Sequence, residues 1–152
     1  MLEVGKAEML DASILAVGAT ITCLAQNIYF EARDQPTVGQ MAVAYVVLNR
    51  VHHPAWPDTV CDVIREGPTY SWKQDYPIRN RCQFSWYCDG KSDTPKEKRA
   101  WLYSQLVAHK VVHGYVKDNT DGSIYYHANY VRPFWSKHYD HTVTLGSHIF
   151  YK

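Results

Sequence analysis

The stretch Ile28-Tyr29-Phe30-Glu31-Ala32-Arg33-Asp34 decides the fold that the sequence predicts. It closes a segment, residues 21–33, whose apolar positions recur at the helical spacing i, i+3, i+4, i+7: Ile21, Leu24, Ala25, Ile28 and Ala32. Glu31 follows Ile28 by three residues, so it projects from the edge of the apolar face rather than from the opposite, solvated side. The pattern predicts a helix that carries a partly buried carboxyl group in its last turn.

Position also bears on the acidity of Glu31. Burial disfavours the carboxylate, and so does the negative end of a helix dipole, so both effects raise the pKa of this carboxyl group. A raised pKa suits a general acid that works near neutral pH. The alternative, which periodicity alone favours, is that Glu31 reaches solvent or pairs with Arg33 or Arg50.

Three further helices are predicted. The first runs from Val38 to about Val51, with Thr37 and Gln40 as a capping box, and it is apolar on all sides, which is typical of a buried central helix. A short helix is expected over about 58–65. The third follows a second capping box, Thr94-Pro95-Lys96-Glu97, and ends near His113.

A short hairpin or strand is expected over 83–87 and an extended strand or loop over 124–130, and a hairpin over 143–150 turns at Gly146-Ser147. Residues 69–93 otherwise form a long aromatic-rich loop, and long loops in small domains are usually functional. Residues 1–19 are expected to be a leading segment, with a short helix over 11–17 that Gly18 ends. The remaining residues, 20–152, form one mainly α (α+β) domain with a small β-hairpin component.

Composition narrows the class of protein. The 152 residues fit one domain, and a net charge of +1 gives no steer toward nucleic acid or membrane surfaces. The 12 tyrosines and five tryptophans exceed what a core of this size needs, and exposed aromatic rings favour a sugar polymer as partner. No stretch approaches the roughly 20 apolar residues of a membrane span. The acidic N-terminus resembles no signal peptide, so we expect synthesis in the cytoplasm or a leader already removed.

Four cysteines allow two disulfides or none. In an oxidising compartment a Cys82–Cys88 bridge is expected first, ahead of Cys61–Cys82. Cys23 lies on the apolar face of the first helix, where a free buried thiol is expected. No C-x-x-C pair occurs, which removes the spacing of a zinc ribbon.

Cleavage of a glycosidic bond needs a proton donor, and many enzymes add a second carboxylate as base or nucleophile. None of the candidates stands at a spacing that obliges it to face Glu31: Asp34, Asp58, Asp62 and Asp89. A single glutamate suffices when the substrate supplies the nucleophile, for example its own hydroxyl or N-acetyl group.

Metal and thiol chemistry are weaker alternatives. His109 and His113 have the spacing of a two-histidine metal site on a helix, but the glutamate of an H-E-x-x-H motif is missing, so no metal and no cofactor are expected. His127, between aromatic residues, is expected to form hydrogen bonds in a cleft. A nucleophilic Cys82 or Cys88 paired with His127 has no local signature of an activated cysteine.

Ordered motifs across residues 20–151 resemble the cell wall hydrolase family of the spore-cortex-lytic enzymes (SleB/CwlJ type). They are Glu31-Ala32-Arg33-Asp34-Gln35-Pro36, Gly39-Gln40, Ala42-Val43-Ala44, Val47-Leu48-Asn49-Arg50-Val51, Cys61-Asp62-Val63-Ile64, Cys82-Gln83-Phe84-Ser85-Trp86, Cys88-Asp89-Gly90, Tyr126-His127-Ala128-Asn129-Tyr130-Val131, Trp135 and Gly146-Ser147-His148-Ile149-Phe150-Tyr151. The resemblance implies a lysozyme-like domain, related to lytic transglycosylases, that cuts peptidoglycan between N-acetylmuramic acid and N-acetylglucosamine.

Roles for particular residues follow from the same resemblance. Glu31 corresponds to the family's essential glutamate, acting as general acid and then base. Arg33 and Asn49 are expected to be structural, fixing the loop after the first helix. The residues expected to bind substrate are Gln83 and Ser85, across the cleft from the glutamate, and Tyr126, His127, Asn129 and Tyr130, along the sugar subsites.

The chain departs from the family in two ways. It shows neither an export signal nor a wall-binding domain, and Asp34 stands where glycine is common. We therefore expect a monomeric phage endolysin, made in the cytoplasm and acting on the wall after release through holin pores, without inserting into the membrane. The alternatives are an N-acetylmuramoyl-L-alanine amidase, which would need an activated water on zinc, and a wall-binding module without catalysis.

Overall fold

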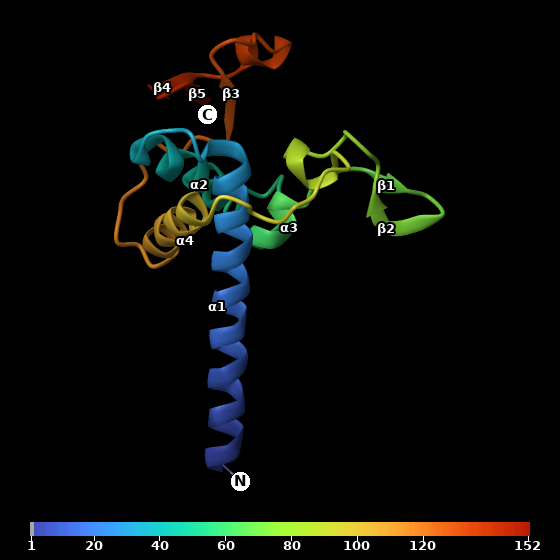
Figure 1. Cartoon of the computed structure of the whole chain (residues 1–152), viewed down its shortest axis with the longest axis vertical. Coiled ribbons are helices and arrows are strands. Elements are labelled where there is room, and N and C mark those ends of the chain that lie inside the picture. The colour runs from blue at the N-terminus through green and yellow to red at the C-terminus, as the bar shows by residue number, and fades with distance from the viewer. Residues whose placement is uncertain (1) are drawn as a thin grey trace.

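A computed structural model describes the backbone of residues 2–152 and side chains from residue 16 onward (Figure 1). Its helices are α1 (Leu2–Ala32), α2 (Thr37–Val51), α3 (Val60–Ile64) and α4 (Lys98–Val112), with 3-10 helices η1 (Ser85–Cys88) and η2 (Phe134–His138). Its strands are β1 (Thr69–Tyr70), β2 (Lys73–Pro77), β3 (Tyr125–Ala128), β4 (His141–Leu145) and β5 (His148–Tyr151). The expected mainly α, α+β architecture is confirmed.

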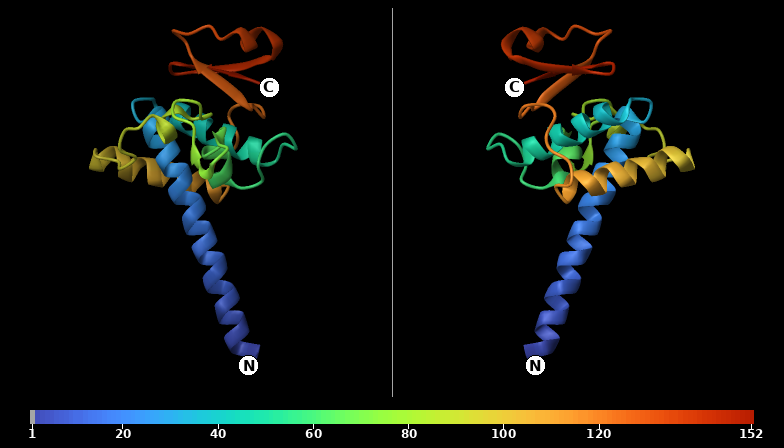
Figure 2. Two further views of the ribbon diagram at one scale, coloured as in Figure 1. Left: turned by 90° about the vertical axis from the view of Figure 1, so that its right-hand side faces the viewer. Right: turned by 90° about the vertical axis from the view of Figure 1, so that its left-hand side faces the viewer.

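Helix α1 is the longest element, and its first half projects away from the rest of the molecule in every view (Figures 1 and 2). Its second half packs against α2, α3 and α4. The separate short helix expected over residues 11–17 is wrong, because the helix continues through Gly18. A single glycine costs a helix only about 1 kcal/mol, and here the Thr22 hydroxyl also donates to the Gly18 carbonyl oxygen at 2.9 Å. Within the part of the chain that is described, no helix has the length and apolar character needed to cross a membrane.

Helix α2 is the buried centre that its composition predicts. Ala42, Val43, Ala44, Val46 and Val47 are all fully buried, and the helix contacts α1 on one side and α4 on another. Each large apolar side chain that is fully buried in this way contributes about 1.5–3 kcal/mol to folding. The core therefore holds the end of α1 in a fixed position.

Strands β3, β5 and β4 form an antiparallel sheet in that order, with Tyr126 opposite Phe150. The expected strand and hairpin are confirmed. Gly146 at the turn has a φ of 58°, and the adjacent Ser147 N–H donates to the Gln35 side-chain oxygen at 2.8 Å. Fully buried Phe150 packs against Ala32 and the middle of α2, so the sheet lies beside the end of α1 (Figure 2).

Two expected capping boxes are absent. Thr37 bonds to Tyr103 and the Gln40 amide donates to the Gln35 carbonyl oxygen, so neither satisfies the start of α2. Helix α4 begins at Lys98, three residues later than expected. The reason is a tertiary contact: the backbone N–H groups of residues 96 and 97 donate to the Tyr29 hydroxyl at 3.1 and 3.0 Å.

The short hairpin or strand expected over 83–87 is also wrong, because this segment contains η1 instead. A disulfide between Cys82 and Cys88 closes the segment into a short loop, which leaves no extended partner strand. The hairpin of this region lies earlier in the chain, where β1 pairs with β2.

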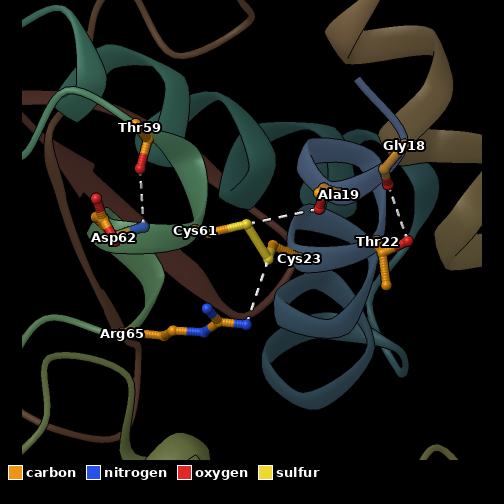
Figure 3. The surroundings of a disulfide bond; sticks show 8 residues. All are labelled: Gly18, Ala19, Thr22, Cys23, Thr59, Cys61, Asp62 and Arg65. Atoms are coloured by element: carbon orange, nitrogen blue, oxygen red, sulfur yellow. Dashed lines mark hydrogen bonds between the residues drawn. A yellow bond between two sulfur atoms is a disulfide. The ribbon is translucent and has the colours of Figure 1, made fainter. Parts of the chain in front are cut away.

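The Cys82–Cys88 bridge confirms the first expectation for the cysteines, but the expectation of a free Cys23 is wrong. Cys23 is bonded to Cys61, which joins α1 to α3 (Figure 3). Their Cα atoms lie 5.4 Å apart, well inside the span that a disulfide can bridge. Periodicity correctly identified Cys23 as buried, but it held no information on which helix packs against it.

Candidate active site

A cavity of about 630 Å³ lies where three distant parts of the chain meet: the end of α1, the disulfide-closed loop 82–88, and the segment from β3 to η2. Eight of its 16 lining residues are aromatic, which gives apolar walls with polar edges suited to sugar rings. The lining residues are Phe30, Glu31, Arg50, Gln83, Phe84, Ser85, Trp86, Tyr125, Tyr126, His127, Ala128, Tyr130, Val131, Trp135, Tyr139 and His148.

Glu31 provides the only carboxyl group among these residues, and it lies in the last turn of α1 as its spacing predicts. Burial raises the pKa of Glu31, while a hydrogen bond from Tyr126 and the charge of Arg50 lower it in part, and the net shift is upward. The ion pairs considered as alternatives do not form: Arg33 pairs with Glu97 at 3.4 Å, and the described side chains give Glu31 no salt bridge. The carboxyl group therefore faces the cavity with its proton held more tightly than usual.

Tyr126 is the direct partner of this carboxyl group. Its hydroxyl donates to Glu31 Oε2 at 2.9 Å, and its ring packs against His148 and Phe150. Burial raises the pKa of Tyr126 well above its usual value, and the nearby Glu31 raises it further. The phenol therefore remains a donor, and it can stabilise the carboxylate each time that Glu31 gives up its proton.

Another part of the cavity wall is built on Trp86. Its ring stacks on Phe30 with centroids 4.9 Å apart, and its indole N–H donates to the buried Asn27 side-chain oxygen at 2.9 Å. This anchoring holds the loop that carries Gln83 and Ser85. Both of these side chains line the cavity and make no hydrogen bond to another described residue, so they are free to bind substrate.

Of the other residues expected to bind substrate, His127 and Tyr130 line the cavity and Asn129 does not. The two ring nitrogens of His127 lie 2.8 Å from the Tyr151 hydroxyl and the Ala128 carbonyl oxygen, so protein partners already occupy both. Tyr130 lies at the rim and is 84% exposed. Asn129 is exposed outside the cavity, where its backbone N–H donates to Ser147.

The candidate second carboxylates lie elsewhere: Asp34, Asp58, Asp62 and Asp89 are all absent from the cavity lining. His109, in the last turn of α4, and His113, just after that helix, have ring centroids 4.4 Å apart and also lie outside the cavity. Across the described side chains, from residue 16 onward, no three His, Cys, Asp or Glu residues are grouped so that they could hold a metal ion.

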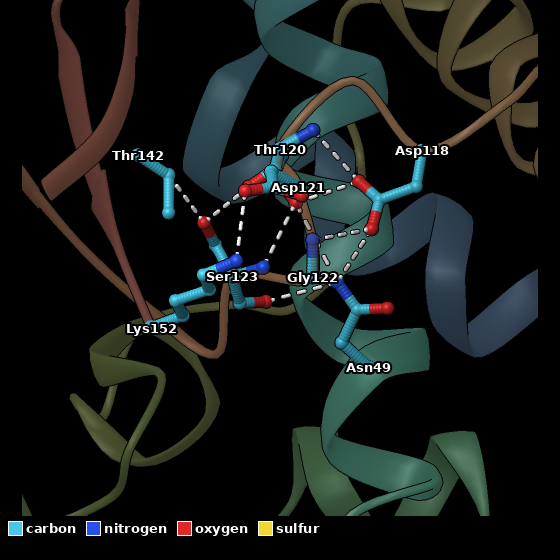
Figure 4. Close-up of polar contacts among 8 residues, drawn as sticks. All are labelled: Asn49, Asp118, Thr120, Asp121, Gly122, Ser123, Thr142 and Lys152. Atoms are coloured by element: carbon cyan, nitrogen blue, oxygen red, sulfur yellow. Dashed lines mark hydrogen bonds and ion pairs between the residues drawn. The ribbon is translucent and has the colours of Figure 1, made fainter. Parts of the chain in front are cut away.

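The two residues assigned structural roles behave as such. Asn49 donates to the Asp118 carboxylate and the Ser123 carbonyl oxygen (Figure 4), although it fixes the turn before β3 rather than the loop after α1. Arg33 donates to Glu97 and to the Tyr29 carbonyl oxygen. Arg50 also lines the cavity, although the sequence suggested it only as an ion-pair partner of Glu31 and not as a binding residue. One signal was available, since Arg50 is the only charged residue in the apolar segment 38–51.

The domain is mainly helical, and its first helix ends in one acidic side chain at the edge of an aromatic cleft. These features place it in the lysozyme-like class of folds. Within that class the family can be named. Residues 34–151 match the Cell Wall Hydrolase family, and the chain belongs to it. The resemblance noted in the sequence is thus confirmed, and so is the expectation of an enzyme of the cell wall.

Individual relatives agree with this assignment. The chain is 54% identical over 58 residues to the spore cortex-lytic enzyme of Halalkalibacterium halodurans and 50% identical over 58 residues to that of Bacillus subtilis. These matches cover 38% of the chain but only 18% and 19% of the two enzymes, so the chain spans about a fifth of their length.

Solved structures match over more of the chain. The catalytic domain of the germination-specific lytic transglycosylase SleB from Bacillus anthracis aligns with a TM-score of 0.62 and 28% identity, over 88% of this chain and 93% of that domain. The catalytic domain of the Bacillus cereus SleB protein gives 0.61 and 28%, over 88% and 89%. The lysozyme-like fold is therefore shown for nearly the whole domain.

Proposed function

We propose that this domain cleaves the glycan strands of peptidoglycan between N-acetylmuramic acid and N-acetylglucosamine, with Glu31 as the only acid and base. The observation that carries the proposal is the Glu31 carboxyl group, which lies in an aromatic cavity, has a raised pKa, and accepts a hydrogen bond from Tyr126. Membership of the Cell Wall Hydrolase family and the fold shared with a lytic transglycosylase support the choice of substrate.

The reaction needs two proton transfers, one from Glu31 and one back to it. In this route Glu31 starts protonated, a state that the upward shift of its pKa by burial favours, and it gives its proton to the glycosidic oxygen as the bond from that oxygen to C1 of the muramic residue breaks. The carboxylate that remains, stabilised by the Tyr126 hydroxyl, takes the proton of the muramic 6-hydroxyl. That oxygen then bonds to C1, which leaves a 1,6-anhydro end, and Glu31 is again protonated.

The geometry suits this route because the substrate supplies its own nucleophile. Glu31 is the only carboxyl group among the described residues that line the cavity, and the route requires no other. Gln83 and Ser85 line the cavity and are proposed to lie across it from Glu31 and to hold the N-acetyl group. Tyr126, His127 and Tyr130 are proposed to line the sugar subsites, and Asn129 could act only at the outer rim.

The test is mass spectrometry of purified peptidoglycan after digestion by wild type, Glu31→Gln and Glu97→Gln. Glu97 is an exposed glutamate outside the cavity, so its variant controls for the loss of one carboxyl group. Anhydro-muropeptides from wild type and Glu97→Gln, but not from Glu31→Gln, are expected. If the digests contained only reducing ends, the reaction would be hydrolysis rather than transglycosylation, and Asp34 would then be tested as the second carboxylate.

The same digests test the two other activities considered. Free stem peptides beside intact glycan, made equally well by Glu31→Gln and lost with a chelator, would refute the proposal in favour of a zinc amidase. Binding without any cleavage would indicate a wall-binding module.

The biological setting is proposed on the sequence alone: a monomeric phage endolysin, made in the cytoplasm and released to the wall through holin pores. Lysis of host cells that depends on a co-expressed holin would support it, and lysis without one would refute the holin step. The division into a leading segment, 1–19, and a catalytic domain, 20–152, predicts that the shorter chain keeps its activity on purified peptidoglycan.

A further inference from the structure

Among the charged residues in the described part of the chain that line the cavity, Arg50 is the most deeply buried. It lies in the last turn of α2 and is only 5% exposed. A guanidinium group in such a position needs compensation, because taking a charge out of water is costly unless it is paired and hydrogen-bonded.

The protein holds this guanidinium in one orientation. Its Nε–H donates to the Ile124 carbonyl oxygen at 2.9 Å. The guanidinium carbon lies 4.1 Å from the centroid of the Trp56 ring, 5.3 Å from that of Phe84 and 5.8 Å from that of Tyr125. Cation–π contact with these rings offsets part of the cost of burial and fixes the plane of the group.

The rest of the group has no partner. Of the five N–H donors of a guanidinium, only the one on Nε is hydrogen-bonded within the described residues, and Arg50 forms no ion pair with them. Glu31 and Glu66 act on it only through their charge: burial lowers the pKa of Arg50, and these carboxyl groups raise it in part. The two terminal nitrogens thus form a rigid, unoccupied fork at the wall of the cavity.

The chemistry of this fork limits what it can bind. It only donates, and its two terminal nitrogens suit an oxygen acceptor, either both oxygens of a carboxylate or the single oxygen of a carbonyl group. The muramic residue of a peptidoglycan glycan strand offers two carbonyl acceptors: the N-acetyl carbonyl and the lactyl carbonyl, whose amide bond carries the stem peptide. A sugar hydroxyl group fits this fork less well, because it is also a donor and its own hydrogen needs a separate acceptor.

We propose that Arg50 is a substrate-binding residue, whose fork receives a carboxyl-derived oxygen of the muramic residue bound against Glu31. The inference rests on the proposed function for the identity of the substrate. It adds a residue that fixes the sugar ring relative to the acid, and it gives a reason for a buried charge on an otherwise apolar helix.

The experiment measures binding without turnover, by isothermal titration of Glu31→Gln and of Glu31→Gln/Arg50→Lys. The ligands are short glycan strands in three forms: intact, N-deacetylated, and lacking the lactyl group together with its stem peptide. Lysine keeps the charge but loses the fork. An exposed arginine outside the cavity, changed as Glu31→Gln/Arg65→Lys, is the matched control.

We expect Arg50→Lys to weaken binding of intact strands at least tenfold while Arg65→Lys changes it less than twofold. The difference should vanish for one of the stripped ligands, and which one identifies the bound group as N-acetyl or lactyl. Equal affinity of both proteins for intact strands, or the same loss for all three ligands, would overturn the proposal.

Two further measurements keep the outcomes separate. If Arg50→Lys does not fold, the test uses the binding of the three ligands to Glu31→Gln. At least one stripped strand is then expected to bind tenfold more weakly than intact strands. Equal binding of all three ligands would refute the inference. In a protein with Glu31 intact, Arg50→Lys is expected to raise KM more than it lowers kcat. Product analysis of Glu31→Gln tests the proposed function independently, because it does not involve Arg50.

Discussion

Replacing Asp118 with asparagine should destabilise the domain far more than its partly exposed position suggests. The Asp118 carboxylate organises the turn before β3 (Figure 4). One oxygen accepts from the Thr120 backbone N–H at 2.7 Å and the Thr120 hydroxyl at 2.6 Å. The other accepts from Asn49 at 2.9 Å and from the Gly122 N–H at 3.0 Å. All four groups donate to this one side chain.

Asparagine cannot satisfy this arrangement in either orientation of its amide. One of the two carboxylate oxygens becomes an NH₂ group, which then faces a backbone N–H and a second donor. Two charge-assisted hydrogen bonds are lost, each worth about 1.5–3 kcal/mol. Asp118 is partly exposed, so water can replace part of these hydrogen bonds. We therefore expect the free energy of unfolding to fall by about 2–4 kcal/mol, which lowers Tm by about 4–16 °C at about 2–4 °C per kcal/mol.

The assay is urea and thermal unfolding followed by circular dichroism, with Asp121→Asn as the control. Asp121 lies in the same turn, but its carboxylate only pairs with Lys152 at the surface, at 2.8 Å, so its loss should cost less than about 1 kcal/mol. Equal and small losses for both variants would refute the reasoning.

The Asp118 effect also has a defined pH dependence. Burial raises the pKa of Asp118, but the hydrogen bonds from Thr120, Asn49 and Gly122 outweigh it and hold the pKa below its usual 3.8. A lowered folded-state pKa means that the carboxylate stabilises the fold fully above that usual value, and that this contribution is lost as the pH falls through the lower, folded-state pKa. The difference between wild type and Asp118→Asn should therefore be complete at pH 7 and shrink below pH 3.8.

Two other predictions concern the cavity and the disulfides. Tyr126→Phe removes a hydrogen bond that lowers the pKa of Glu31, so the alkaline limb of the pH–activity profile should move to higher pH; an unchanged limb would mean that Glu31 is not the titrating acid. Serine variants of each disulfide should separate stability from activity. Losing Cys23–Cys61, which closes 38 residues, should cost about 4 kcal/mol of stability, and losing Cys82–Cys88, which closes six, about 2 kcal/mol. The second pair should nevertheless lower activity on peptidoglycan more, and the reverse order would contradict the role given to the loop.

The parts of the fold that could be predicted from the sequence are those that local spacing determines. Helix α2 is recognisable because nearly every position in it is apolar, and the β4–β5 hairpin because Gly146 tolerates the positive φ that its turn requires. The start of α4 could not be predicted, since the groups that satisfy it are not a local capping box but the hydroxyl of Tyr29, more than 60 residues earlier. Cys61 as the partner of Cys23 is the same kind of case.

The candidate site follows the same division between local and distant information. Glu31 could be placed at the edge of a cleft because its own helix defines the apolar face beside it. Its partner Tyr126 lies 95 residues away, and only the fold brings the two together. Arg50 combines local and distant information. The apolar segment around it indicates that it is buried, and a buried charge requires a partner. The sequence does not indicate, however, that part of the guanidinium remains unpaired. That unpaired part is what a substrate can use, so the residues hardest to find from periodicity are those whose function depends on an incomplete set of contacts.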